Sequence, residues 1–149
     1  MKRREFLNTS AKALCACMAG TGISLIQSCT NNVVESPTSG GDGDELLFDI
    51  TSTGFTALLT DGGSVVTNGN SIDPSGLVLV RVGDGVRAFQ NRCTHSSYPL
   101  EPFNNGVAMC TSGHGGSFNT NGQGISPPAY TSLKEYTTSL EGNDLTVFS

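Results

Sequence analysis

Short apolar segments separated by turn residues dominate the chain from residue 45 onward. The segments are rich in β-branched and aromatic side chains, clusters of Gly, Asn and Asp separate them, and no competing segment has a helical period. The pattern predicts strands at residues 46–50, 55–60, 77–82, 86–90, 133–140 and 145–148. These elements indicate an all-β fold of antiparallel strands, either a sandwich or a barrel.

The turn residues predict how some of these strands pair. Gly83-Asp84-Gly85 supplies residues that tolerate a positive φ, so the strands on either side of it are expected to form a hairpin. Asn68-Gly69 marks another turn, and Gly142-Asn143-Asp144 precedes the closing strand. Residues 45–149 are long enough for one domain with one core.

The N-terminal segment, residues 1–28, has the composition of an export signal. Lys2-Arg3-Arg4-Glu5-Phe6-Leu7 precedes a weakly apolar stretch at 13–26, which is shorter than the roughly 20 residues that span a bilayer. This arrangement resembles a twin-arginine signal. An ordinary basic signal or a retained anchor is the alternative.

The segment at 29–44 predicts a lipidated cysteine followed by a linker. Ile26-Gln27-Ser28-Cys29 resembles a bacterial lipoprotein cleavage box, in which Cys29 carries the lipid, and an unmodified thiol is the alternative. The polar Ser, Thr, Pro, Gly and Asp residues that follow cannot bury a core and indicate a flexible tether. We therefore expect an exported protein of the bacterial cell envelope that is anchored to the membrane by lipid and faces the periplasm.

Charge limits the classes of partner. The whole chain has a formal charge of -5, whereas residues 30–149 carry four basic and 12 acidic side chains, a net charge of -8. Nucleic acids and anionic lipid headgroups need a basic patch, which four scattered cations do not supply. The sequence therefore predicts no nucleic-acid partner.

The cysteines and histidines outside the N-terminal segment form two short motifs. Cys93-Thr94-His95 follows one predicted strand, and Cys110 and His114 follow another apolar run. A disulfide between the two cysteines would close a loop of 18 residues and contribute about 3 kcal/mol. A tetrahedral zinc ion with two sulfur and two nitrogen ligands is a second interpretation. A two-iron cluster is a third.

A longer pattern surrounds these motifs. After Cys110 and His114-Gly115 come Phe118, Gly122, Pro127-Pro128-Ala129, Leu133 and Tyr136, in that order. This order resembles the Rieske family of [2Fe-2S] proteins. The resemblance implies a Rieske-like antiparallel sandwich or barrel with a small cluster-binding subdomain, in which Pro127-Pro128 belongs to a third loop that shields the cluster.

The resemblance also implies a ligand set and a function. In the family each ligand loop donates one Cys to one iron and one His to the other. Applied to this chain, the cluster ligands are Cys93, His95, Cys110 and His114. The implied function is single-electron transfer with a redox partner protein, as a component of an oxidoreductase system rather than as a stand-alone enzyme. The alternative function is a cluster-free, disulfide-bonded or zinc-binding β module for binding or scaffolding.

The sequence departs from the family pattern within the loops. Cys110 precedes His114 by four residues, whereas the family has three, which predicts a bulge at Ser112-Gly113. The cysteine pair that links the loops in quinol-oxidising members is replaced by Tyr98 and Gly113. Ferredoxin-like transfer to a protein is therefore expected.

Hydroxyl groups that donate hydrogen bonds in other family members are missing at two positions. Gly116 stands where a serine usually follows, and Phe118 lacks a phenol hydroxyl. Fewer donors stabilise the reduced cluster less, which predicts a potential in the lower part of the family range of about -150 to +300 mV. Tyr98, Pro99, Leu100 and Phe103, just beyond the first loop, either form a docking surface or pack beneath it.

Overall fold

The domain is built around one strand that is buried on both faces. The computed structural model describes residues 43–149, all within one compact unit, Ser39–Ser149. In strand β3, Leu77–Val82, the first four residues are fully buried. Because successive side chains of a strand point to opposite faces, Leu77 and Leu79 join one apolar cluster while Val78 and Val80 join another. β3 therefore separates two halves of the core.

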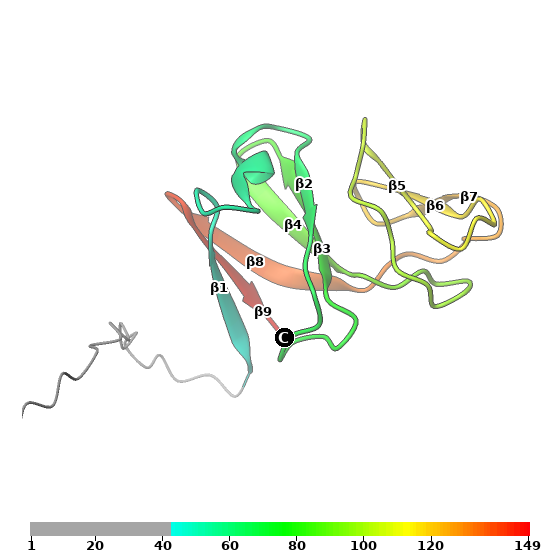
Figure 1. Ribbon diagram of the computed structural model, residues 1–149, viewed down its shortest axis with the longest axis horizontal. Coiled ribbons are helices and arrows are strands. Elements are labelled where there is room, and N and C mark those ends of the chain that lie inside the picture. The colour runs from blue at the N-terminus through cyan, green and yellow to red at the C-terminus, as the bar shows by residue number, and fades with distance from the viewer. Residues whose placement is uncertain (1–42) are drawn as a thin grey trace, which may run out of the picture. The chain divides into compact units, whose positions relative to one another are not determined.

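A six-stranded antiparallel sheet contains β3 and forms the larger part of the domain (Figure 1). Its order is β1-β9-β8-β4-β3-β2. The other strands are β1 (Glu45–Asp49), β2 (Ser64–Val66), β4 (Gly85–Gln90), β8 (Glu135–Glu141) and β9 (Asp144–Phe148). The sheet curls as Figure 1 shows, and this curled, almost helix-free architecture confirms the predicted all-β fold.

A second, three-stranded sheet lies between β4 and β8 in the chain. Its order is β5-β6-β7, with β5 (Val107–Met109), β6 (Ser117–Asn119) and β7 (Gly124–Ser126). We call residues 93–133, which include this sheet, the loop lobe. Residues 43–92 and 134–149 are the sheet body. The loop lobe corresponds to the small subdomain that the sequence predicts.

Both hairpins predicted from turn residues are present in the sheet body. β3 pairs with β4, and Gly83 has a φ of 57° in the turn between them. β8 pairs with β9, and Gly142 has a φ of 62° in that turn. Glycine accepts this left-handed conformation at little cost, so each turn lets the chain reverse directly.

The prediction of a strand at residues 55–60 is wrong. This segment contains a short 3-10 helix, η1 (Thr56–Leu59), in which the Leu58 amide donates to the Phe55 carbonyl at 2.9 Å. A repeat of three residues per turn puts Phe55 and Leu58 on the same side, where both contact the core cluster that contains Leu77. The two apolar residues therefore fit a helical turn rather than the alternation of a strand.

Phe89 of β4 connects the sheet body to the loop lobe. Its side chain is fully buried, and its ring centroid lies 6.1 Å from that of Phe103. Gly122, with a φ of 74°, packs so tightly against this ring that a Cβ there would lie 2.6 Å from a Phe89 carbon. The two regions therefore share one apolar cluster, and Gly122 is required where they meet.

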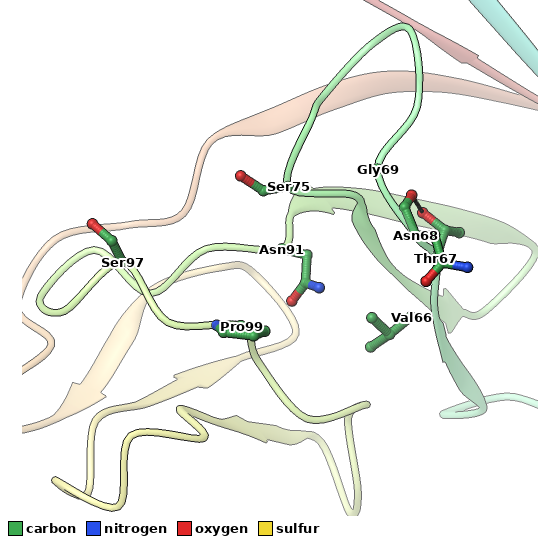
Figure 2. Close-up of a pocket in the computed structure, with 8 residues that line it drawn as sticks. All are labelled: Val66, Thr67, Asn68, Gly69, Ser75, Asn91, Ser97 and Pro99. Carbon is green, nitrogen blue, oxygen red and sulfur yellow. Dashed lines mark hydrogen bonds between the residues drawn. The ribbon is translucent and has the colours of Figure 1, made fainter.

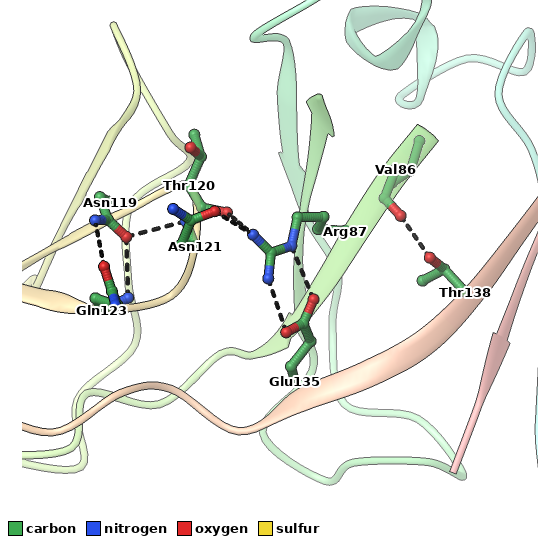
Figure 3. A network of polar contacts seen from close by, with 8 residues as sticks. All are labelled: Val86, Arg87, Asn119, Thr120, Asn121, Gln123, Glu135 and Thr138. Atoms are coloured by element: carbon green, nitrogen blue, oxygen red, sulfur yellow. Dashed lines mark hydrogen bonds and ion pairs between the residues drawn. The ribbon is translucent and has the colours of Figure 1, made fainter. Parts of the chain in front are cut away.

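A polar contact made by Arg87 also joins the two regions (Figure 3). Its guanidinium donates to both carboxylate oxygens of Glu135, each at 2.8 Å, within the sheet body. The remaining nitrogen donates to the Thr120 carbonyl at 3.1 Å and to the Asn121 side chain, both in the turn between β6 and β7. Arg87 thus holds that turn against the sheet.

The predicted signal segment and Cys29 lie outside the described residues, as does the predicted linker up to residue 42. Among residues 43–149, no helix is long and apolar enough to cross a membrane.

Candidate metal centre

The first predicted ligand loop is a tight turn that follows β4. The Cys93 amide donates to the Tyr98 carbonyl at 2.8 Å, and the Ser97 amide donates to the Cys93 carbonyl at 2.9 Å. Ser97 has a φ of 61°, a conformation that a non-glycine residue rarely adopts. These bonds close the loop on itself and leave His95 exposed near its tip.

The second predicted ligand loop is also closed by a backbone hydrogen bond. Cys110 follows β5, and its amide donates to the Gly116 carbonyl at 2.9 Å. Gly113 and Gly115 have φ values of 74° and 83°. The extra residue between Cys110 and His114 is therefore accommodated in a turn. A bulge was predicted at Ser112-Gly113, whereas the register shift between β6 and β7 lies at Ser117 and Phe118.

The two loops begin side by side. Leu100 and Cys110 form an isolated antiparallel bridge. The Thr111 amide and hydroxyl both donate to the Pro99 carbonyl, at 3.0 and 2.9 Å. Two segments separated by about ten residues in the sequence are thus held together by backbone contacts at the base of the loops.

The two cysteines form a buried pair of free thiols. Cys93 is 2% exposed and Cys110 is 6% exposed, and both belong to the apolar cluster that contains Phe118. Two hydroxyls approach the Cys110 sulfur, Ser96 Oγ at 3.2 Å and Ser112 Oγ at 3.1 Å. Burial raises the pKa of the Cys110 thiol, but hydrogen bonds with Ser112, Ser96 and Cys93 outweigh it, so the net pKa is lowered.

The two histidines, by contrast, are exposed. The ring centroids of His95 and His114 lie 6.2 Å apart, with the ring planes inclined at 46°. The structure therefore gathers all four predicted site residues at one end of the loop lobe, as a buried thiol pair and an exposed imidazole pair. Within residues 43–149, no three Cys, His, Asp or Glu side chains are grouped as ligands of one metal ion.

A third loop contacts both ligand loops. It contains Pro127-Pro128, joined by a cis peptide bond. The Ser126 hydroxyl donates to the Gly115 carbonyl at 2.6 Å, and the Thr94 hydroxyl donates to the Thr131 carbonyl at 3.2 Å. This loop therefore lies against both predicted ligand loops.

The residues just beyond the first loop divide between surface and core. Tyr98 is 55% exposed and Pro99 is exposed, whereas Leu100 and Phe103 are buried in the cluster shared with the cysteines. Tyr130, in the third loop, is 78% exposed. The sequence analysis anticipated both fates for this segment but did not identify Tyr130.

A polar cavity of about 380 Å³ lies beside the ligand loops (Figure 2). Its lining residues are Val66, Thr67, Asn68, Gly69, Ser75, Asn91, Ser97 and Pro99. The buried Asn91 side chain accepts a hydrogen bond from the Leu100 amide at 2.8 Å and so supports the chain after the first loop. The lining includes none of the predicted ligands.

The contacts of Ser96 and Ser112 with Cys110 could not be predicted from the sequence. Ser96 directly follows His95, and Ser112 lies between the other two predicted ligands. The presence of a serine in each ligand motif is the feature of the sequence that could have indicated these contacts. It is a weak one, because serine is common in turns and usually bonds to nearby backbone.

Comparisons with known proteins agree with this architecture. The Sphingomonas yanoikuyae B1 ferredoxin is 24% identical with a TM-score of 0.50, and the match covers 60% of this chain and 88% of that chain. Naphthalene 1,2-dioxygenase with indole bound in its active site is 21% identical with a TM-score of 0.54, and the match covers 70% of this chain but 25% of that chain. At these identities, the two matches show that the fold is similar. No curated protein matches the sequence.

A family model gives a more specific result. The model described as Rieske [2Fe-2S] domain matches residues 59–137, which is more than half of the chain and includes both ligand loops. The resemblance inferred from the residue order is thereby confirmed at the level of family and cofactor. The chain therefore belongs to the Rieske [2Fe-2S] domain family, and its cofactor is a [2Fe-2S] cluster.

Proposed function

We propose that this protein is a one-electron carrier whose cluster is held by Cys93 and Cys110 on one iron and by His95 and His114 on the other. The observation that carries the proposal is the pairing of two buried thiols with two exposed imidazoles on neighbouring loops. This division of donors suits a two-iron cluster with a different ligand pair on each iron. When bound, the cluster supplies a site that accepts and releases one electron.

The environment of each pair supports its proposed role. The thiols belong to an apolar cluster with Phe118 and Ala129, which keeps water from the sulfur ligands. The imidazoles are exposed, so a partner can approach the iron that they would ligate. The family membership of the chain supports electron transfer through a [2Fe-2S] cluster.

Iron and sulfide analysis with low-temperature EPR tests the proposal. The purified protein is expected to contain two irons and two sulfides per chain, and Cys110→Ala is expected to lose both. Thr111→Val is a matched control in the same loop, because its hydroxyl bonds to Pro99 and not to a sulfur. A colourless wild-type protein with Cys93 disulfide-bonded to Cys110, or one with a single zinc ion, would contradict the proposal.

The charge distribution supports a partner that docks without ion pairs. Glu101 is the only Asp, Glu, Lys or Arg in the loop lobe, residues 93–133. Among residues 43–149, the adjacent Arg92 is the one cation whose side chain contacts this lobe near the predicted ligands, because it donates to the Ser97 hydroxyl at 2.9 Å. The exposed aromatic side chains of the first and third loops, Tyr98 and Tyr130, are also uncharged. We therefore propose a redox partner protein whose docking surface is uncharged and partly apolar.

Ionic strength tests this partner class. Steered association between charged surfaces slows steeply with salt. The rate constant for electron transfer with the physiological partner is expected to change less than about twofold between low and physiological salt, because few charges flank the site. Glu101→Gln should leave that weak dependence unaltered. A steep salt dependence in the wild type would indicate a charged partner surface instead.

We further propose that the carrier is exported and lipid-anchored in the bacterial cell envelope, facing the periplasm. Support comes from the Arg3-Arg4 pair and from Cys29 at the end of the cleavage box. Substituting both arginines by lysine should leave precursor in the cytoplasm, and Cys29→Ala should abolish the lipid adduct detected by mass spectrometry. Membrane attachment that persists without Cys29 would indicate an uncut signal anchor.

A further inference from the structure

One predicted cluster ligand receives polar contacts that the other lacks. Ser96 Oγ and Ser112 Oγ lie 3.2 and 3.1 Å from the Cys110 sulfur. Within residues 43–149, no hydroxyl makes a corresponding contact with Cys93, and the nearest hydroxyl in sequence, on Thr94, donates to the Thr131 carbonyl instead. The hydroxyl contacts are therefore concentrated on one of the two thiols.

The direction of these two hydrogen bonds follows from the chemistry of a thiolate. A cysteine that ligates iron has lost its hydrogen and can only accept hydrogen bonds. Both serine hydroxyls would then have to donate to the sulfur. Ser112 is already arranged for this role, because its oxygen accepts the His114 amide at 3.5 Å and so leaves its own hydrogen available for Cys110.

The two hydroxyls come from different loops. Ser96 belongs to the first ligand loop and Ser112 to the second, and both are half-buried. The contact of Ser96 with Cys110 therefore joins the two loops, while Ser112 contacts Cys110 within the second loop.

We propose that Ser96 and Ser112 are positioning residues that raise the reduction potential of the cluster by donating hydrogen bonds to the Cys110 sulfur. The proposal rests on the proposed function, specifically on Cys110 as an iron ligand. Reduction adds negative charge to the cluster and its sulfur ligands, so a donor at such a sulfur stabilises the reduced form more than the oxidised form. The two serines thus supply donors in a chain that lacks hydroxyls at positions 116 and 118.

Protein-film voltammetry on full-length variants tests this proposal. Ser96→Ala and Ser112→Ala are each expected to lower the equilibrium constant for reduction about three- to tenfold, because each removes one charge-assisted hydrogen bond. Tenfold corresponds to about 59 mV for a one-electron couple. Ser96→Thr and Ser112→Thr, which keep the hydroxyl, should restore most of the potential.

Thr111→Val is the matched control for these substitutions. Thr111 lies between Cys110 and Ser112, but its hydroxyl donates to Pro99, and the Thr111 amide keeps its own bond to Pro99 in the valine variant, so the potential should be unchanged. Pulsed EPR on protein exchanged into D₂O adds a second readout. Exchangeable deuterons near the cluster should decrease in number in the alanine variants and not in the control.

The outcomes separate this proposal from the proposed function. A wild-type protein without iron and sulfide, or a Cys110→Ala variant that keeps them, would contradict the proposed function. Loaded alanine variants with the wild-type potential would overturn the role of the serines alone. If both alanine variants lose the cluster, the wild-type protein exchanged into D₂O decides, and an absence of exchangeable deuterons at hydrogen-bond distance from the cluster overturns the tuning role.

Discussion

The sheet body and the loop lobe are built by different means. Strands in the sheet body reach seven residues, as in β8, and continuous ladders hold them together. Every strand of the loop lobe has three residues, and its ligand loops depend on single backbone bonds, positive-φ glycines and hydroxyl contacts. Among the described residues, all the basic side chains and every acidic one except Glu101 lie in the sheet body.

This difference shows how order and exposure are divided within one domain. A long ladder satisfies its own backbone groups and determines its own register. Short loops that expose two imidazoles cannot satisfy their backbone groups in this way. Their conformation depends instead on a core shared with the sheet and on the bound cluster. We therefore expect the loop lobe to be the less stable region and the one more sensitive to loss of the cluster.

Removal of a cysteine should produce the largest difference in stability between the loop lobe and the sheet body. Cys93→Ala is expected to lose the cluster entirely, because two irons with an incomplete ligand set are not retained. Hydrogen exchange should then increase in β5, β6 and β7 and remain slow in β8 and β9, whose cluster around Leu145 contains no predicted ligand. Cys29→Ala should keep the iron. Equal loss of protection in both regions would show that they unfold as one unit.

Truncation of the shared core should have the next largest effect. Phe89→Ala is expected to reduce the free energy of unfolding by about 3–5 kcal/mol, because the ring is fully buried between the two regions. Leu58→Ala, within the sheet body alone, should cost about 2–5 kcal/mol. Thermal unfolding of both variants measures these costs, and EPR should change for Phe89→Ala only. An altered EPR signal in Leu58→Ala would contradict the separation.

The buried carboxylate of Asp73 should make the sheet body sensitive to acid. Burial raises the pKa of Asp73, but hydrogen bonds from Tyr136, Ser75 and Gln90 outweigh it, and the net pKa is lowered. A lowered folded-state pKa gives stability that is present above the unfolded-state value of about 3.9 and is lost as the pH falls through the folded-state value.

Asp73→Asn tests this linkage. The variant is expected to lose about 1–3 kcal/mol of stability at neutral pH and to show a flatter decline of stability below about pH 4. Urea unfolding across the pH range measures both effects. Glu141→Gln, at an exposed carboxylate of β8, is the control and should change stability by less than about 0.5 kcal/mol. An unchanged acid profile in Asp73→Asn would exclude Asp73 as the source.

The smallest expected effect concerns the polar contact between the two regions. Arg87→Lys keeps the charge but loses the two-pronged bond to Glu135 and the contacts with the β6–β7 turn, and should cost about 1 kcal/mol because the pair is partly exposed. Hydrogen exchange at Gly122 should increase while EPR remains unchanged. Arg81→Lys, whose partner is the Gly83 carbonyl, should not affect that amide.

The sequence by itself determined the all-β class and both glycine-containing hairpins, and it predicted the four ligand residues that lie on the two neighbouring loops. Strand alternation and turn residues are local properties, so they can be recognised without the fold. The prediction of a strand at residues 55–60 was wrong because Phe55 and Leu58 are three residues apart, as in a helical turn. In a short apolar run this spacing does not distinguish a helical turn from a strand reliably.

Only the tertiary structure decided which groups contact the predicted ligands. Ser96 and Cys110 are 14 residues apart, and they meet because the Leu100–Cys110 bridge aligns the two loops. Likewise, the double burial of β3 depends on a loop lobe contributed by a later part of the chain. A hydroxyl in a turn has many local acceptors, so its partner is set by the packing of distant segments rather than by neighbouring residues.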